Sequence, residues 1–91
     1  MKLVLIEWVD SMAGHNGWEC LNELESLLPA RPTSVGFILE EIEDYITLVQ
    51  TVDDTQILGR ITIPKHCILD IFPIPDPRER DVDTKLREGA P

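Results

Sequence analysis

A polar cluster between two tryptophans is the part of this 91-residue chain best suited to chemistry or ligand binding. It comprises Asp10, Ser11, His15 and Asn16, flanked by Trp8 and Trp18. Carboxylate, hydroxyl and imidazole groups can form hydrogen bonds beside an aromatic platform, but an enzyme site also needs a second strong acid or a metal ligand within reach. The cluster has neither. We therefore expect it either to bind a ligand or only to form turn hydrogen bonds, with Asn16 capping a helix.

The two cysteines and two histidines do not form a pattern typical of catalysis or metal binding. His66 adjoins Cys67, but neighbours on a turn point apart, whereas a nucleophile must reach its base. Cys20 and Cys67 lack the paired spacing of zinc ligands and are too few for a disulfide framework, so both are expected to be core thiols. The carboxylates at 40–44 could hold Ca²⁺, but a solvated hairpin tip is favoured. We expect no cofactor, no metal and no enzyme activity.

The charge of the chain restricts its partners. The net charge is −9, and residues 1–74 contain only four basic residues. Because nucleic acids are bound largely by neutralising phosphates, we expect no nucleic-acid partner, whereas a basic protein would be attracted. A phosphate-rich ligand would require Arg31, Arg60 and Lys65 to converge across a subunit boundary. No apolar run approaches the roughly 20 residues of a membrane span, and no signal peptide is recognised, so a cytoplasmic location is expected.

Apolar spacing predicts a mainly β chain with one short helix. Alternation over residues 2–9 is typical of a strand, and leucines at positions 21, 24 and 28 indicate an amphipathic helix over 18–28. Three further strands are predicted over residues 33–42, 45–52 and 56–63, with Gly59 marking a bulge or a close backbone approach. Pro64 must interrupt pairing, so a single turn at 64–67 precedes a last strand at 68–72 that can pair with the first.

The composition changes after residue 74. Alternating prolines lead into a segment of mixed charge with few apolar residues, which cannot bury enough surface to offset the entropy of ordering. The sequence therefore predicts a small β-barrel domain over 1–74 and a flexible, disordered or partner-ordered tail over 75–91. A marginal helix at 78–88 docked on an oligomer surface is the alternative for the tail.

Two resemblances accompany these patterns. The segment from Gly59 through Ile63-Pro64-Lys65-His66-Cys67-Ile68 resembles the closing part of Src-homology-3-like (SH3-like) barrels, in which a single 3₁₀ turn precedes the last strand. The chain also resembles small proteins of tailed phages and prophages through Trp8-Val9-Asp10-Ser11, Gly17-Trp18, residues 34–40 and residues 45–48. These resemblances imply a five-stranded SH3-like, or Sm-like, barrel. The aromatic groove that binds polyproline has no counterpart, so that activity is not implied.

Two functions remain open at this point. The first is a phage-encoded binding protein that captures a host component, either a protein or a small nucleotide-like signal, and counteracts host defence, with pockets formed between subunits of a homo-oligomer. The second is a structural or adaptor module of a phage assembly acting through protein contacts. The candidate contact residues are Trp8, Asp10, Ser11, His15, Asn16, Trp18, Arg31, Arg60 and Lys65.

Overall fold

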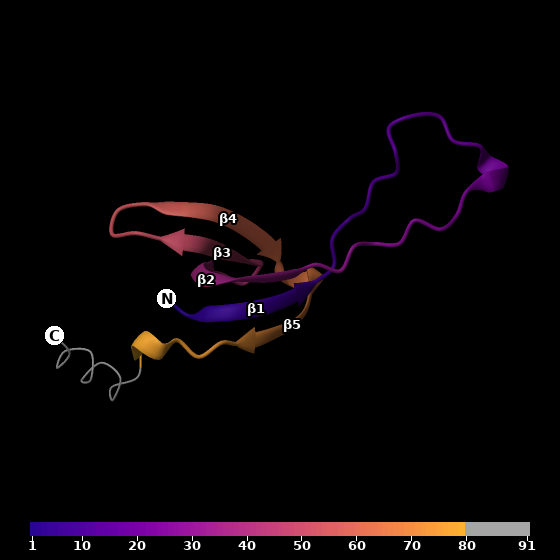
Figure 1. The fold of residues 1–91 in the computed structure, drawn as a ribbon. Coiled ribbons are helices and arrows are strands. Elements are labelled where there is room, and N and C mark those ends of the chain that lie inside the picture. Colours follow the sequence, from indigo (N-terminus) through magenta and orange to yellow (C-terminus); the bar gives the residue numbers. More distant parts are fainter. Residues whose placement is uncertain (80–91) are drawn as a thin grey trace.

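Five antiparallel strands form one open sheet in the computed structural model, which describes residues 1–79 (Figure 1). The strands are β1 (Leu3–Trp8), β2 (Thr33–Glu41), β3 (Tyr45–Val52), β4 (Ile57–Pro64) and β5 (Ile68–Pro73). Their order across the sheet is β4-β3-β2-β1-β5, so β4 and β5 are the two edges. The predicted mainly β architecture, with five strands and a last strand paired to the first, is confirmed.

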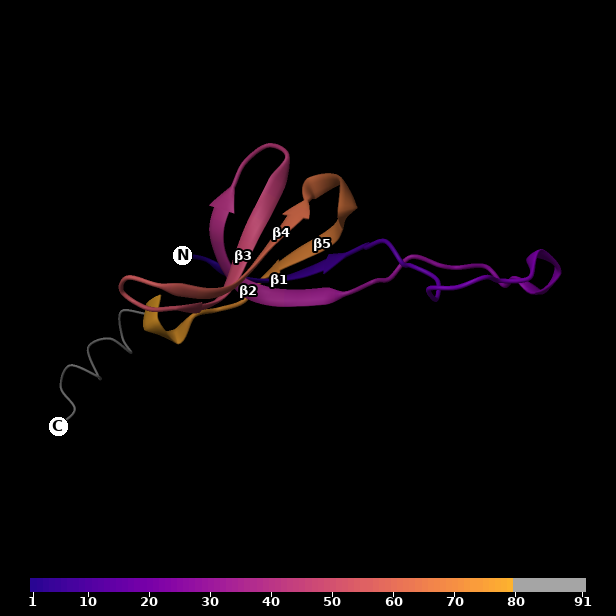
Figure 2. The same ribbon diagram turned by 90° about the horizontal axis from the view of Figure 1, so that it is seen from above.

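The sheet curls around a small apolar core. Alternate residues of β1 are buried, and Ile6 packs in one cluster with Ile46 and Leu48 of β3 and Ile63 of β4. In the sheet order β1 and β4 are separated by β2 and β3, yet Ile6 and Ile63 are both fully buried in this single sheet, so the sheet must bend strongly to cover them. Figure 1 shows β3 and β4 above β1 and β5, and in Figure 2 the tip of the hairpin between β2 and β3 projects away from the line of β1. The core is therefore the concave face of a bent sheet.

Glycine allows the closest approach between two of the strands. Gly36 of β2 is buried, and a Cβ atom at this position would lie 2.9 Å from the carbonyl oxygen of Val49. The β2 and β3 register then shifts between Ile38 and Glu40, a local irregularity of the kind that bends a sheet. At Gly59 of β4 the backbone has φ of +79°, which L side chains rarely adopt. The close neighbour at Gly59 is the Gln50 side chain, 2.9 Å from the position of an added Cβ, and the β3 and β4 register shows no shift there, so the glycine is required by its backbone conformation and marks neither a bulge nor a close backbone approach.

The connection from β4 to β5 crosses from one edge of the sheet to the other. After Pro64 the chain forms the 3₁₀ turn η2 (Lys65–Cys67), as predicted. The Lys65 amide donates to the Asp44 carbonyl at 2.8 Å, and the Val9 amide donates to the Cys67 carbonyl at 2.8 Å. These bonds attach the turn to the β2 and β3 hairpin on one side and to the end of β1 on the other.

The helix predicted over 18–28 is wrong. This segment contains only the 3₁₀ turn η1 (Leu21–Glu23), flanked by the extended residues Cys20 and Leu24. An isolated helix shorter than about 12 residues is marginal unless it packs its apolar face on something, and this segment projects away from the sheet. Asn16 consequently has no helix to cap. Cys20 is exposed, so its assignment as a core thiol is also wrong, whereas Cys67 is half-buried.

The described chain ends in the 3₁₀ turn η3 (Pro77–Glu79) after β5. Residues 80–91 lie outside the described residues, and with them most of the predicted tail at 75–91 and of the alternative helix at 78–88. Within residues 1–79 there is no helix of the length and apolar character needed to span a bilayer.

Replacing Ile63 tests whether the curl depends on the concave core. Ile63 is fully buried, so Ile63→Ala should lower the free energy of unfolding by roughly 2–5 kcal/mol through lost burial and a residual cavity. Ile42→Ala is the matched control, because this isoleucine is 41% exposed and its truncation should cost less than half as much. Urea unfolding followed by circular dichroism measures both; equal losses would contradict the buried role of Ile63.

Candidate functional site

A long arm formed by residues 9–32 projects from the end of the sheet opposite the N-terminus (Figure 1). At its base, Asp10 and Ala30 exchange backbone hydrogen bonds of 2.9 and 3.0 Å, and the Trp8 amide donates to the Pro32 carbonyl at 3.1 Å. Beyond this bridge, no backbone hydrogen bond joins the two halves of the arm in the described chain. The arm stretches the described protein to 69 Å along one axis, against 23 Å across.

The arm carries apolar side chains that no other part of residues 1–79 covers. Trp18 is completely exposed, at 101% of its reference area, and Leu21 is 85% exposed. Further exposed apolar residues of the arm are Met12, Leu24, Leu27 and Leu28. A soluble domain rarely leaves so many large apolar side chains together in water unless the surface is used for contact. The arm is therefore the first candidate for a binding site.

The two tryptophans of the sequence-predicted site lie in different environments. Trp8 is buried in the concave core, and its Nε1–H donates to the Ser34 hydroxyl at 3.0 Å. Trp18 projects into solvent from the arm. The expectation that Trp8 belongs to the core is confirmed. The two rings do not form the common aromatic platform that their flanking positions suggested.

The polar residues between the tryptophans follow the arm without forming a closed cluster. The Asp10 carboxylate accepts a 2.8 Å hydrogen bond from the Ser11 amide, which is a turn contact at the arm base. His15 lies 3.8 Å from Glu19, and both are largely exposed. Asn16 is exposed as well. Of the two roles expected for Asp10 and Ser11, ligand binding or turn hydrogen bonds, the structure shows the turn hydrogen bond.

The three basic residues that a phosphate-rich ligand would require across a subunit boundary lie on different elements of the described chain. The Lys65 ammonium is 3.1 Å from the Glu41 carboxylate, while Arg31 is at the arm base and Arg60 is on β4. Arg60 lines two shallow hollows, and neither includes Arg31 or Lys65.

The first two carboxylates of the acidic segment at 40–44 each bind another side chain. Glu40 accepts a 2.8 Å hydrogen bond from the Tyr45 hydroxyl, and this bond and the negative charge raise the pKa of Tyr45. Glu41 forms the ion pair with Lys65. Within residues 1–79, no three histidine, cysteine, aspartate or glutamate side chains gather to form a metal site.

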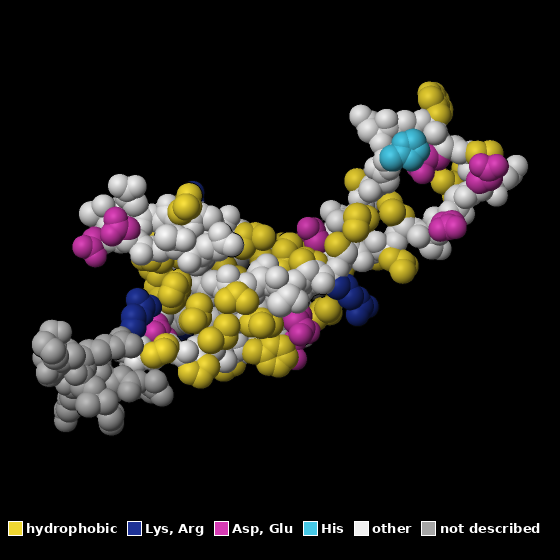
Figure 3. All heavy atoms as spheres, viewed as in Figure 1, with side chains coloured by type: hydrophobic (Ala, Val, Ile, Leu, Met, Phe, Trp, Pro, Cys, Tyr) yellow, Lys and Arg dark blue, Asp and Glu magenta, His cyan; other side chains and the backbone are white. Residues whose placement is uncertain are grey.

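The convex side of the sheet presents a second apolar surface. Residues directly opposite each other in an antiparallel pair share a face, so Leu5 lies between Val35 on β2 and Phe72 on β5. Leu3 and Phe37 form the adjacent row. We call these five residues the open face; Val35 is 49% and Phe72 is 44% exposed. Figure 3 shows hydrophobic side chains reaching the surface along the sheet.

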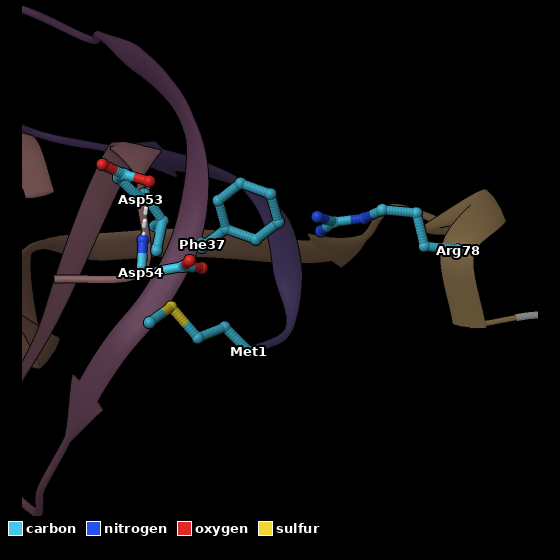
Figure 4. Close-up of a pocket in the computed structure, with 6 residues that line it drawn as sticks. Met1, Phe37, Asp53, Asp54 and Arg78 are labelled. Atoms are coloured by element: carbon cyan, nitrogen blue, oxygen red, sulfur yellow. Dashed lines mark hydrogen bonds between the residues drawn. The ribbon is translucent and has the colours of Figure 1, made fainter. Parts of the chain in front are cut away.

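One end of the open face carries a charged clamp that the sequence did not indicate. Arg78 of η3 lies 5.5 Å from the centre of the Phe37 ring and 2.6 Å from the Asp76 carboxylate. Figure 4 shows Arg78 directed toward Phe37, with Asp53, Asp54 and Met1 around the same hollow. The only sequence signal for this contact is the position of Asp76 two residues before Arg78, which allows their side chains to pair.

Comparisons with known proteins give no further guide to the site: no family model, no curated protein and no solved structure matches this chain.

The Asp76 and Arg78 clamp predicts a titration that can be measured. Hydrogen bonds from the Arg78 side chain and backbone lower the pKa of Asp76 from 3.8 to about 2. Because the folded-state pKa lies below the unfolded one, the clamp stabilises the fold above pH 4, and this contribution disappears as the pH falls from about 4 to 2. Carboxyl NMR should show this midpoint.

The variant Arg78→Ala should raise the pKa of Asp76 only part of the way to 3.8, because the backbone N–H of residue 78 still donates to the carboxylate at 3.0 Å. Arg60→Ala is the control and should leave the Asp76 titration unchanged. A midpoint of Asp76 near 3.8 in the original chain would show that the clamp does not form in solution.

Proposed function

We propose that this chain is a non-enzymatic binding protein that captures another protein through its arm. The observation that carries this proposal is the complete exposure of Trp18 on an arm that leaves the sheet. Tryptophan is the residue type most enriched among those that dominate binding energy at protein interfaces. Leucines at 21, 24, 27 and 28 add further exposed apolar area along the same arm, so the arm has the composition of an interface before any partner is present.

The form of the arm supports a protein as the captured component. Its apolar side chains are distributed along an extended segment, and the hollow that Leu24 and Leu27 line also carries the carboxylates of Glu19, Glu23 and Glu25. Sites for small molecules, in contrast, are concave and mostly apolar, and they bury most of the ligand. The separation of Arg31, Arg60 and Lys65 within one chain also disfavours a small nucleotide-like signal. A long exposed surface suits contact with a complementary groove on a protein.

The sheet acts as the support of the arm. Both ends of the arm continue directly from strands, β1 and β2, whose pairing fixes where it starts and ends. We assign the bent sheet to the SH3-like type on the strength of the 3₁₀ turn before β5 and the resemblance described above. On the same resemblance, the chain is a phage-encoded protein that acts on a host protein in the host cytoplasm and thereby opposes host defence.

A photo-crosslinking residue at position 18 tests the proposal. With p-benzoylphenylalanine in place of Trp18, irradiation of cells that produce the chain should yield an adduct of one discrete mass. The matched control is the same residue in place of Thr55, which is exposed in the turn between β3 and β4. The adduct from position 18 should disappear when Leu21→Asp and Leu24→Asp are added, because charge in the apolar surface opposes its desolvation.

The proposal fails if position 18 gives no adduct, or gives the same adducts as position 55. Native mass spectrometry of the purified chain provides a second measurement. A small molecule retained by the chain in fixed stoichiometry would overturn protein capture in favour of the alternative ligand class.

A further inference from the structure

We propose that the arm of one chain lies across the open face of a second copy, so that two chains form a reciprocal dimer by exchanging arms. This inference rests on the proposed function because it uses the same apolar arm: in the free protein a second copy covers the arm, and a captured protein would take the place of that copy. The exchange of arms joins two apolar surfaces of the described chain: the arm, and the part of the open face around Val35 and Phe72 that stays exposed beyond the contact of Arg78 with Phe37. In the proposed dimer, each apolar surface is buried by the other.

The arm cannot cover the open face of its own chain. The hydrogen bonds at Asp10, Ala30 and Pro32 make the arm a continuation of β1 and β2, and both views show it directed away from the sheet (Figures 1 and 2). The open face lies on β1, β2 and β5, before the bridge between Asp10 and Ala30 from which the arm projects. The arm of the same chain therefore leaves this face uncovered, whereas the arm of a second copy is free to reach it.

Charge complementarity favours the arm as the cover. Phe37 of the open face is opposite Val49, and Val49 is opposite Arg60, so Arg60 borders the open face on β4. Arg60 is exposed and has no ion-pair partner among the described residues. Glu23 and Glu25 of the arm are also exposed and unpaired within the described part of the chain. An arm on the open face would bring unpaired carboxylates to an unpaired guanidinium.

Two-fold symmetry makes the exchange self-limiting. If the first arm contacts the second open face, the same rotation places the second arm on the first open face, and the interface closes with two identical halves. The net charge of −9 on each chain opposes any approach of two copies. Attraction must therefore come from local contacts, namely apolar burial by the arm leucines and Trp18 together with the pairs between glutamate and Arg60.

A disulfide trap can test the proposed contact, because the arm already carries an exposed thiol at Cys20. In the full chain with Cys67→Ala, Val35→Cys adds a sulfur on the open face, and Thr55→Cys adds one at a control position on the β3 and β4 turn. Mild oxidation of the Val35→Cys chain should give a species of doubled mass on a non-reducing gel. Cleavage after glutamate should then show position 20 joined to position 35, while the Thr55→Cys control should remain largely uncrosslinked.

Sedimentation equilibrium of the unmodified chain should give twice the 10.3 kDa mass of one chain, falling toward the single mass on dilution. Arg60→Glu should weaken association at least fivefold, and adding Glu23→Arg and Glu25→Arg should restore it. Restoration distinguishes paired charges from a loss of folding. The inference is overturned if the chain sediments as a monomer, if position 20 links only to position 20 of another chain, or if the control crosslinks equally.

The two proposals fail in different ways. A monomeric purified chain that still crosslinks from position 18 to another protein in cells would overturn arm exchange and leave protein capture intact. A monomeric chain that gives no crosslink from position 18 would overturn both.

Discussion

The complete burial of Ile6 and Ile63 in one apolar cluster is the feature on which the rest of the structure depends. These residues come from strands separated by two others in a single sheet, so both can be fully buried only if the sheet curls around them. The curl gives the sheet its concave core. It also leaves the opposite faces of β1, β2 and β5 on the convex side, where Leu5, Val35 and Phe72 remain accessible. A flat sheet of the same strands would have no core, because it would have no second layer to bury either face.

Much of this sheet could be predicted from local sequence patterns. Alternation identified each strand to within one or two residues, and Pro64 located the turn that separates β4 from β5, because a residue without an amide hydrogen must interrupt pairing. Trp8 was assigned to the core because it shares a strand face with Val4 and Ile6. Each of these inferences uses a constraint that acts within a few residues of the chain and does not depend on the three-dimensional environment.

The arm and the surfaces around it could not be predicted in the same way. The leucines at 21, 24 and 28 have helical spacing. A segment this short forms a stable helix only when another surface packs against its apolar side, and no part of the described chain does so. Cys20 is exposed for the same reason: no part of the described chain packs against this segment. The contact of Arg78 with Phe37 joins residues far apart in the sequence, so it depends on register and on the path after β5, which local patterns do not specify.

The bridge between Asp10 and Ala30 separates the chain into two parts that can change independently. Because the strands on the sheet side of the bridge are paired whatever lies beyond it, the length and composition of the projecting segment can vary with little cost to folding, and each doubling of a flexible loop costs only about 0.6 kcal/mol in closure entropy. Over evolutionary time, such a division lets insertions and substitutions alter recognition while the scaffold is preserved. The same division makes the projecting segment a natural place to graft foreign peptides.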